Sequence, residues 1–138
     1  MTVINIKPFQ VCGPINNVDT YSDVTKKYLD HQEFKKTPQS KFVTSSILGG
    51  NIHVFYSETG QCVGVEVFPP LKLIWDDVEL LSKDLKFIDN LFKQRNIGTE
   101  VSDSGIEIPS LGISLYSHDF DDSLCCSVDS VYVLLNSN

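Results

Sequence analysis

The sequence predicts an α+β protein in which an antiparallel sheet of about six to seven strands carries two helices packed on one face. Alternating apolar residues in Ile52 to Tyr56 and in Gln61 to Phe68, joined by a turn at Gly60, indicate a β-hairpin. Apolar residues at helical spacing between Ser82 and Asn96 indicate the clearest helix. A chain of 138 residues has the length of one domain with its own core, so residues 1–138 are expected to form a single domain.

The first half is expected to begin with a strand from Val3 to Phe9, which Pro8 helps to end. A helix from about Tyr21 to Glu33 follows, with Asp19 or Thr20 as its N-cap. Pro38 marks a loop, because the residue before a proline avoids helical angles. Further strands are expected at Lys41 to Leu48 and, as a short piece, from Leu71 to Trp75.

In the second half, Ser82 is a suitable N-cap for the helix that ends near Asn96, and Gly98 is expected to supply a left-handed cap. Strands are then expected at Gly105 to Ile108, Gly112 to Tyr116 and Val128 to Leu135. The segment from Ser117 to Ser123 reads as a charged loop between the last two strands.

The two halves follow one plan of a helix and three strands, over residues 19–70 and 80–138. Ile52-His53-Val54-Phe55 corresponds to Ile113-Ser114-Leu115-Tyr116, which suggests a weak two-fold internal repeat. Chance similarity between strand–turn–strand segments is the alternative. Such a sheet would leave the face away from the helices free for a partner.

Charge is distributed very unevenly along the chain. Residues 1–95 contain all 11 Lys and Arg with 11 Asp and Glu, whereas residues 96–138 contain seven Asp and Glu and no Lys or Arg. The whole net charge of −7 therefore belongs to the last third. Such a field repels nucleic acid and anionic membranes and attracts basic proteins, although acidity that merely maintains solubility is the commoner case.

The amino-terminal residues lack the basic and apolar regions of a secretory signal, and no apolar stretch is long enough to cross a membrane. The four cysteines, Cys12, Cys62, Cys125 and Cys126, lack the paired spacing of a zinc site. We therefore expect a cytoplasmic protein with reduced thiols that serve in packing.

The sequence predicts no enzyme and no cofactor, because phosphate-binding glycine loops, GxSxG and HExxH are absent. His53 lies in mid-strand beside large apolar residues, where a structural role is favoured. The alternative is a small hydrolase or nucleotide-modifying enzyme with a pocket near His53, in which His53, Cys62 and Glu66 would point inward together.

Two acidic clusters are candidate partner-binding sites. His118 to Asp122 contributes Asp119, Asp121 and Asp122, and its lack of glycine and of a downstream glutamate argues against calcium, so no metal is predicted. A solvated acidic turn is one reading, and a mimic of phosphate charge facing a basic cleft is the other. The second cluster comprises Trp75, Asp76, Asp77 and Glu79. An aromatic ring among acids suits a hot spot for a cationic partner, and a core role for Trp75 fits equally well.

Three stretches resemble a set of small bacterial immunity proteins of polymorphic toxin and contact-dependent growth-inhibition systems: Gly60 to Pro69, Asp77 to Leu81 and Ser110 to Tyr116. The resemblance covers roughly residues 50–135 and consists of strand and turn signatures. It implies a cytoplasmic protein that binds a cognate toxin domain and blocks it. We expect a monomer or weak dimer whose acidic surface occludes the basic cleft of the toxin, such as a nuclease. It transfers no contact residue. A structural or regulatory subunit that pairs through a sheet edge is a further alternative.

Overall fold

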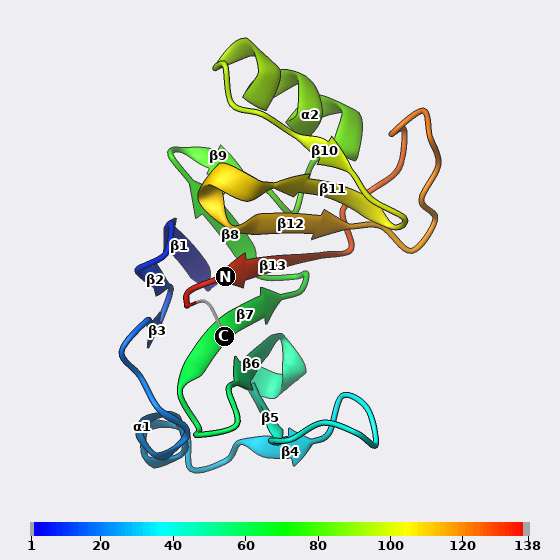
Figure 1. The fold of residues 1–138 in the computed structure, drawn as a ribbon. Coiled ribbons are helices and arrows are strands. Elements are labelled where there is room, and N and C mark those ends of the chain that lie inside the picture. Colours follow the sequence, from blue (N-terminus) through cyan, green and yellow to red (C-terminus); the bar gives the residue numbers. More distant parts are fainter. Residues whose placement is uncertain (1, 137–138) are drawn as a thin grey trace.

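The computed structural model describes residues 2–136, which form two β-sheets and two α-helices. The larger sheet has eight strands in the order β10-β11-β12-β13-β7-β6-β5-β4, and it extends from β10 near α2 to β4 near α1 (Figure 1). Its strands are β4 (Gln32–Phe34), β5 (Thr44–Ile47), β6 (Ile52–Tyr56), β7 (Cys62–Val67), β10 (Glu100–Val101), β11 (Gly105–Ile108), β12 (Ile113–Tyr116) and β13 (Ser130–Leu134).

The smaller sheet has five strands in the order β3-β2-β1-β8-β9. They are β1 (Val3–Lys7), β2 (Val11–Cys12), β3 (Ile15–Asn16), β8 (Lys72–Trp75) and β9 (Val78–Glu79). Within it β1 and β8 pair in parallel, with Ile4 opposite Leu73. The α+β class with mostly antiparallel pairing is therefore confirmed, whereas a single sheet of six to seven strands was wrong. Strands of only two residues have no periodicity that a sequence pattern could reveal.

One face of the larger sheet is buried. Residues paired across neighbouring strands project from the same face, so the register aligns apolar side chains in rows across the sheet. One row contains Ile52, Val67, Val131, Leu115 and Ile106, and the next contains Val54, Val65, Val133, Ile113 and Ile108. All ten side chains have 0% exposure. They belong to one core cluster with side chains from both helices and from the smaller sheet, which together cover this face.

The first helix, α1 (Tyr21–Lys27), begins where Thr20 and Asp23 form a reciprocal capping box. Val24 is its buried residue, and the Tyr21 ring meets Tyr56 of β6 edge-to-face at 5.6 Å between centroids. The predicted end near Glu33 was wrong. Residues 32–34 pair with β5 instead, so tertiary strand pairing prevails over local helix propensity there.

The second helix, α2 (Leu85–Gln94), buries Leu85, Ile88 and Phe92. Its N-cap is Asp84 and not Ser82, since the Asp84 carboxylate accepts the Phe87 N–H at 2.8 Å. Its left-handed residue is Asn96, with φ 59°, and not Gly98. Neither helix in residues 2–136 is long and apolar enough to cross a membrane.

The elements recur in the same order in the two halves. The first half runs α1, β4, β5, a 3₁₀ turn (Leu48–Gly50), β6 and β7, and the second runs α2, β10, β11, a 3₁₀ turn (Pro109–Leu111), β12 and β13. Each half thus supplies four strands to the larger sheet, where three were predicted. The last strands of the halves, β7 and β13, pair at its centre. An origin by duplication stays a prediction.

We expect Gly105→Ala to destabilise the protein by about 1–3 kcal/mol, because a Cβ at Gly105 would lie 1.8 Å from the backbone oxygen of Leu115 on the paired strand. Gly98→Ala is the matched control, since a Cβ there meets nothing within 4 Å and its φ is not left-handed. Urea unfolding measures both free energies. Equal stabilities of the two variants would contradict the close β11–β12 approach.

Candidate partner-binding site

An acidic hollow of about 380 Å³ lies where the loop between β12 and β13 meets the start of α2. We call this feature the acidic hollow. Its lining contains four carboxylates and no Lys or Arg. The lining residues are Asp84, Ser117, Asp119, Asp121, Cys125, Cys126, Ser127 and Asp129.

The loop is held against α2 by backbone hydrogen bonds. The first N–H groups of the helix have no partner within the helix itself. Leu85 N–H donates to the Cys126 carbonyl at 3.0 Å, and Lys86 N–H donates to the Leu124 carbonyl at 2.9 Å. Leu124 and Cys126 belong to this loop, and their side chains are buried. The start of a helix and the end of a distant strand therefore bring the carboxylates together.

Three of the four carboxylates are fixed by backbone donors through one of their oxygens. Asp84 Oδ1 accepts the Phe87 N–H at 2.8 Å, and Asp121 Oδ1 accepts the Ser123 N–H at 2.7 Å. Asp129 Oδ2 accepts the His118 N–H. The Ser123 hydrogen bond lowers the pKa of Asp121 from its ordinary value of 3.8, so this carboxyl is ionised at neutral pH.

Ser117 lies at the end of β12 and is 5% exposed. Within residues 2–136 its hydroxyl is the one buried side-chain polar atom without a hydrogen-bond partner. Buried polar groups in native proteins are nearly always paired, because an unpaired one keeps the full cost of losing its contact with water. The Ser117 hydroxyl is therefore a local cost to the stability of the free protein, next to the acidic hollow.

The sequence prediction located part of this hollow. Asp119 and Asp121 line it, whereas Asp122 is exposed on the same loop outside the lining. Asp84, Ser117 and Asp129 were not among the predicted residues. Asp84 and Asp129 are separated by 45 positions, and only the fold shows that they share a site. The overall charge imbalance was the one signal in the sequence that pointed to Asp129.

The Trp75 cluster is built differently from the predicted hot spot. Trp75 is only 9% exposed and packs against Phe92, with 4.9 Å between ring centroids. The Arg95 guanidinium lies over the indole at 5.4 Å and forms a 2.6 Å ion pair with Asp76. The indole ring is thus part of the hydrophobic core, and the Asp76 carboxylate is already paired with Arg95 of the same protein.

Asp76 and Asp77 make the tight turn between β8 and β9, with φ of 46° and 66°. Both values are positive, as in the two-residue turns that suit a twisted hairpin, and Asp tolerates this conformation better than most residues. Asp76 and Asp77 are exposed and Glu79 is partly buried. The pair Asp76–Arg95 marks the carboxyl end of α2, while the acidic hollow lies at its amino end, about 15 Å away along a helix of ten residues.

The residues of the alternative enzyme site do not converge. His53 and Glu66 are paired neighbours on the face of the larger sheet that faces away from the core. Cys62 projects into the core with 0% exposure, and burial raises its pKa to about 12. His53 is instead surrounded by Phe34 and Phe68, with ring centroids 5.0 and 4.7 Å away.

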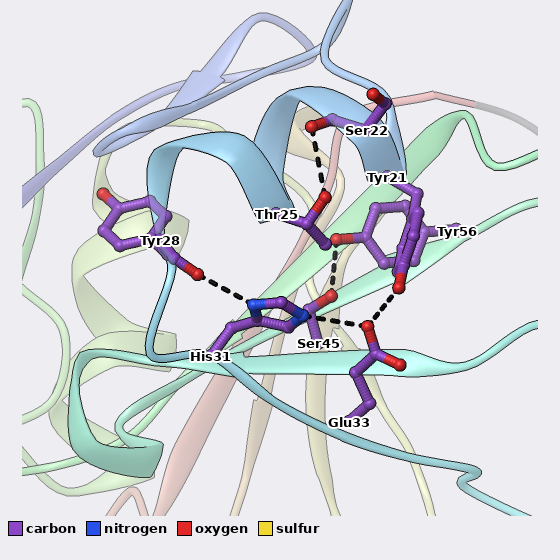
Figure 2. A network of polar contacts seen from close by, with 8 residues as sticks. All are labelled: Tyr21, Ser22, Thr25, Tyr28, His31, Glu33, Ser45 and Tyr56. Atoms are coloured by element: carbon purple, nitrogen blue, oxygen red, sulfur yellow. Dashed lines mark hydrogen bonds and ion pairs between the residues drawn. The ribbon is translucent and has the colours of Figure 1, made fainter.

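A second polar network joins α1 to β4 (Figure 2). His31 Nδ1 donates to the Tyr28 carbonyl at 2.8 Å, and His31 Nε2 lies 2.9 Å from Glu33 Oε2, which also accepts the Tyr21 hydroxyl. Both ring nitrogens face oxygen acceptors, and this arrangement favours the doubly protonated imidazolium. The Glu33 contact and then the Tyr28 carbonyl raise the pKa of His31 above 6.5.

Basic side chains gather in another part of the molecule. A hollow of about 580 Å³ lies between the β4–β5 loop and the β6–β7 hairpin, and Lys36 and Lys41 line it together with Phe42 and Phe55. Lys36 lies over the Phe55 ring at 4.9 Å. Glu58 also lines this hollow, so it has charged residues of both signs, whereas the charged residues that line the acidic hollow are all carboxylates.

Comparison with models of known protein families, with curated proteins and with solved structures finds no match. Within residues 2–136, no three His, Cys, Asp or Glu side chains are placed to hold a metal ion together. The acidic hollow is thus described by its own geometry: a volume of about 380 Å³ and four carboxylates, three of them held by backbone donors.

We expect the two partly buried histidines to titrate on opposite sides of 6.5. The Glu33 contact raises the pKa of His31, while burial among aromatic rings lowers the pKa of His53. NMR titration of the imidazole protons measures both values.

Glu33→Gln should lower the pKa of His31 and leave that of His53 unchanged. The pKa of Glu33 is lowered from 4.5 by the Tyr21 hydroxyl and then by His31. The stabilisation from this network is therefore greatest between about pH 4.5 and 6.5. It declines as pH rises through the raised pKa of His31 and as pH falls through the lowered pKa of Glu33. A His31 pKa below that of His53 would contradict the network.

Ser117→Ala is expected to raise the free energy of unfolding by about 1 kcal/mol, because it removes a buried hydroxyl without a hydrogen-bond partner. Ser127→Ala, at an exposed serine in the same lining, should change stability by less than about 0.5 kcal/mol. Chemical denaturation of both variants measures the difference. A clear loss of stability in Ser117→Ala would show that the hydroxyl has a partner in the free protein.

Proposed function

We propose that the protein is a binding module that neutralises a basic protein toxin domain in the cytoplasm, as an immunity protein of polymorphic toxin or contact-dependent growth-inhibition systems. The acidic hollow would meet the cationic active-site cleft of the toxin and occlude it. The observation that carries the proposal is the gathering of four carboxylates, without any Lys or Arg, in one hollow.

Long-range charge supports this proposal. All seven acidic residues of the last third are unbalanced by any cation in that part of the sequence. Two of them, Asp119 and Asp121, line the acidic hollow from the middle of the loop, and Asp129 lines it from the position just before the last strand. A surface of this kind accelerates encounter with a basic partner and repels nucleic acids. A nuclease domain, whose own cleft attracts phosphate groups, would have the complementary charge.

The fixed geometry of the carboxylates also favours binding. Backbone donors hold Asp84, Asp121 and Asp129, so little side-chain entropy remains to be lost when a partner binds. Asp76, Asp77 and Glu79 at the other end of α2 would extend the acidic surface. Trp75 would act from within the core, where it supports the turn that presents these acids.

The test is co-expression of the protein with the toxin-like domains encoded beside it in its native host, followed by affinity capture at low and moderate salt. We expect recovery of a basic domain and rescue of growth. The triple variant Asp119→Lys, Asp121→Lys and Asp122→Lys should weaken the Kd about 100-fold or more, because like charges then face each other.

The matched control reverses the same number of charges at exposed positions outside the lining, with Glu58→Lys, Glu100→Lys and Glu107→Lys. This control should weaken the Kd by less than about tenfold, through the long-range field alone. Circular dichroism verifies that both variants are folded. Capture of no basic protein, or equal losses in the two triple variants, would overturn the proposed function or its site.

A further inference from the structure

We propose that the hollow between the β4–β5 loop and the β6–β7 hairpin binds a small aromatic carboxylate. The ring of the ligand would pack against Phe42 and Phe55, and its carboxylate would pair with Lys36 and Lys41. This hollow shares no lining residue with the acidic hollow, so the inference goes beyond the proposed function and does not depend on it.

Two tight turns form the walls of this hollow. In the β4–β5 loop, the Thr37 N–H donates to Ser40 Oγ at 3.1 Å, and the Ser40 N–H donates to the Thr37 carbonyl at 3.0 Å. In the β6–β7 hairpin, the Gly60 N–H donates to the Ser57 carbonyl at 3.0 Å, and the Ser57 hydroxyl accepts the Gln61 N–H at 3.2 Å. Both walls are thus held by local hydrogen bonds, so a ligand would enter a hollow that is already formed.

Two phenylalanine rings supply the apolar part of the lining. Phe42 is held by Tyr21 and Tyr56, with ring centroids 5.3 and 5.5 Å away. Phe55 is held by Tyr132, with ring centroids 5.7 Å apart. Both phenylalanines are only partly buried and line the hollow, so each offers apolar area to a ligand there. Aromatic rings attract other aromatic rings beyond the burial of area, so this lining favours a planar aromatic ligand over a saturated one.

Lys36 and Lys41 supply the positive charge. Both side chains are exposed, and none of the ion pairs within residues 2–136 involves either lysine. Lys36 Nζ lies 4.9 Å from the centroid of the Phe55 ring, so one cation stands directly beside the aromatic surface. A lysine ammonium has donors only and pairs with an anion. A ligand with a carboxylate next to an aromatic ring therefore meets both kinds of group at once.

Glu58 limits the charge that the ligand can carry. It is exposed, lines the same hollow and takes part in none of the ion pairs of the described residues. Two lysines and this glutamate give the lining a net charge of +1 in a chain whose net charge is −7. A monoanion balances this charge, whereas a dianion would leave an excess negative charge facing Glu58. The volume of about 580 Å³ is typical of a small-molecule pocket.

The experiment titrates the full chain with 2-naphthoate and follows the backbone amide resonances by NMR. Two comparison ligands each lack one feature: decahydro-2-naphthoate keeps the charge without the aromatic rings, and 2-naphthamide keeps the rings without the charge. We expect saturable shifts within residues 36–44 and 55–59 for 2-naphthoate. The Kd of each comparison ligand should be at least about threefold weaker, because each loses either the ring contacts or the ion pairs.

Lys36→Gln combined with Lys41→Gln should weaken the Kd for 2-naphthoate about tenfold, because two exposed ion pairs are lost. Lys35→Gln combined with Lys72→Gln is the matched control, since it removes the same charge at exposed positions outside the lining. This control should leave the Kd within about twofold, because solvent screens distant charges. Glu58→Gln should strengthen binding about twofold, because it removes a negative charge that faces the ligand. Circular dichroism verifies that each variant is folded.

The outcomes test each part of the inference. Equal Kd values for 2-naphthoate and decahydro-2-naphthoate would overturn the aromatic assignment, and an equal Kd for 2-naphthamide would overturn the anionic one. Equal losses in the two double lysine variants, or shifts that lie mainly outside residues 36–44 and 55–59, would overturn the site. The absence of saturable shifts with 2-naphthoate would overturn the whole inference and leave the proposed function standing.

Discussion

The pairing of β7 with β13 is the interaction on which the rest of the structure depends. Val65 and Val67 lie opposite Val133 and Val131, and none of the four side chains is exposed. Each half of the chain contributes four strands to the larger sheet, and this pair alone joins them there. Burying one such valine contributes about 1.5–2 kcal/mol, and the antiparallel register also aligns the apolar rows on one face. Without it, neither half would have a complete core surface for its helix.

The sequence revealed the parts of the fold whose signals are local. The hairpin of β6 and β7 alternates over two long strands, and α2 has an apolar stripe with suitable end residues. The smaller sheet has no comparable signal, because β2, β3 and β9 have two residues each and β1 meets β8 from nearly 70 positions away. The early end of α1 depends on the pairing of residues 32–34 with β5. This pairing is a tertiary contact, so the local sequence does not reveal it.

In the candidate site, too, some residues have a signal in the sequence and others are found only in the folded structure. The excess of acidic residues in the last third of the sequence pointed to the loop that carries Asp119 and Asp121. The net charge of a segment can be counted without knowledge of the fold. Ser117 and Asp84 have no such signal, since a buried unpaired hydroxyl and a shared hollow exist only after the helix start and the strand ends have met. The sequence alone fits both a surface position and a core position for Trp75, because acidic residues follow it in either case. Its packing against Phe92 decides for the core.

The position of β13 near the end of the described chain has a consequence for synthesis. On a ribosome, β6 and β7 emerge more than 60 residues before the strand that completes their sheet. At about 5–20 residues per second, β7 keeps a free edge of N–H and C=O groups for about 3–13 seconds. During that interval the β13 of a neighbouring copy that is synthesised but not yet folded offers the same complementary edge. An exchange of this strand between two nascent copies would produce a swapped dimer with the same central register.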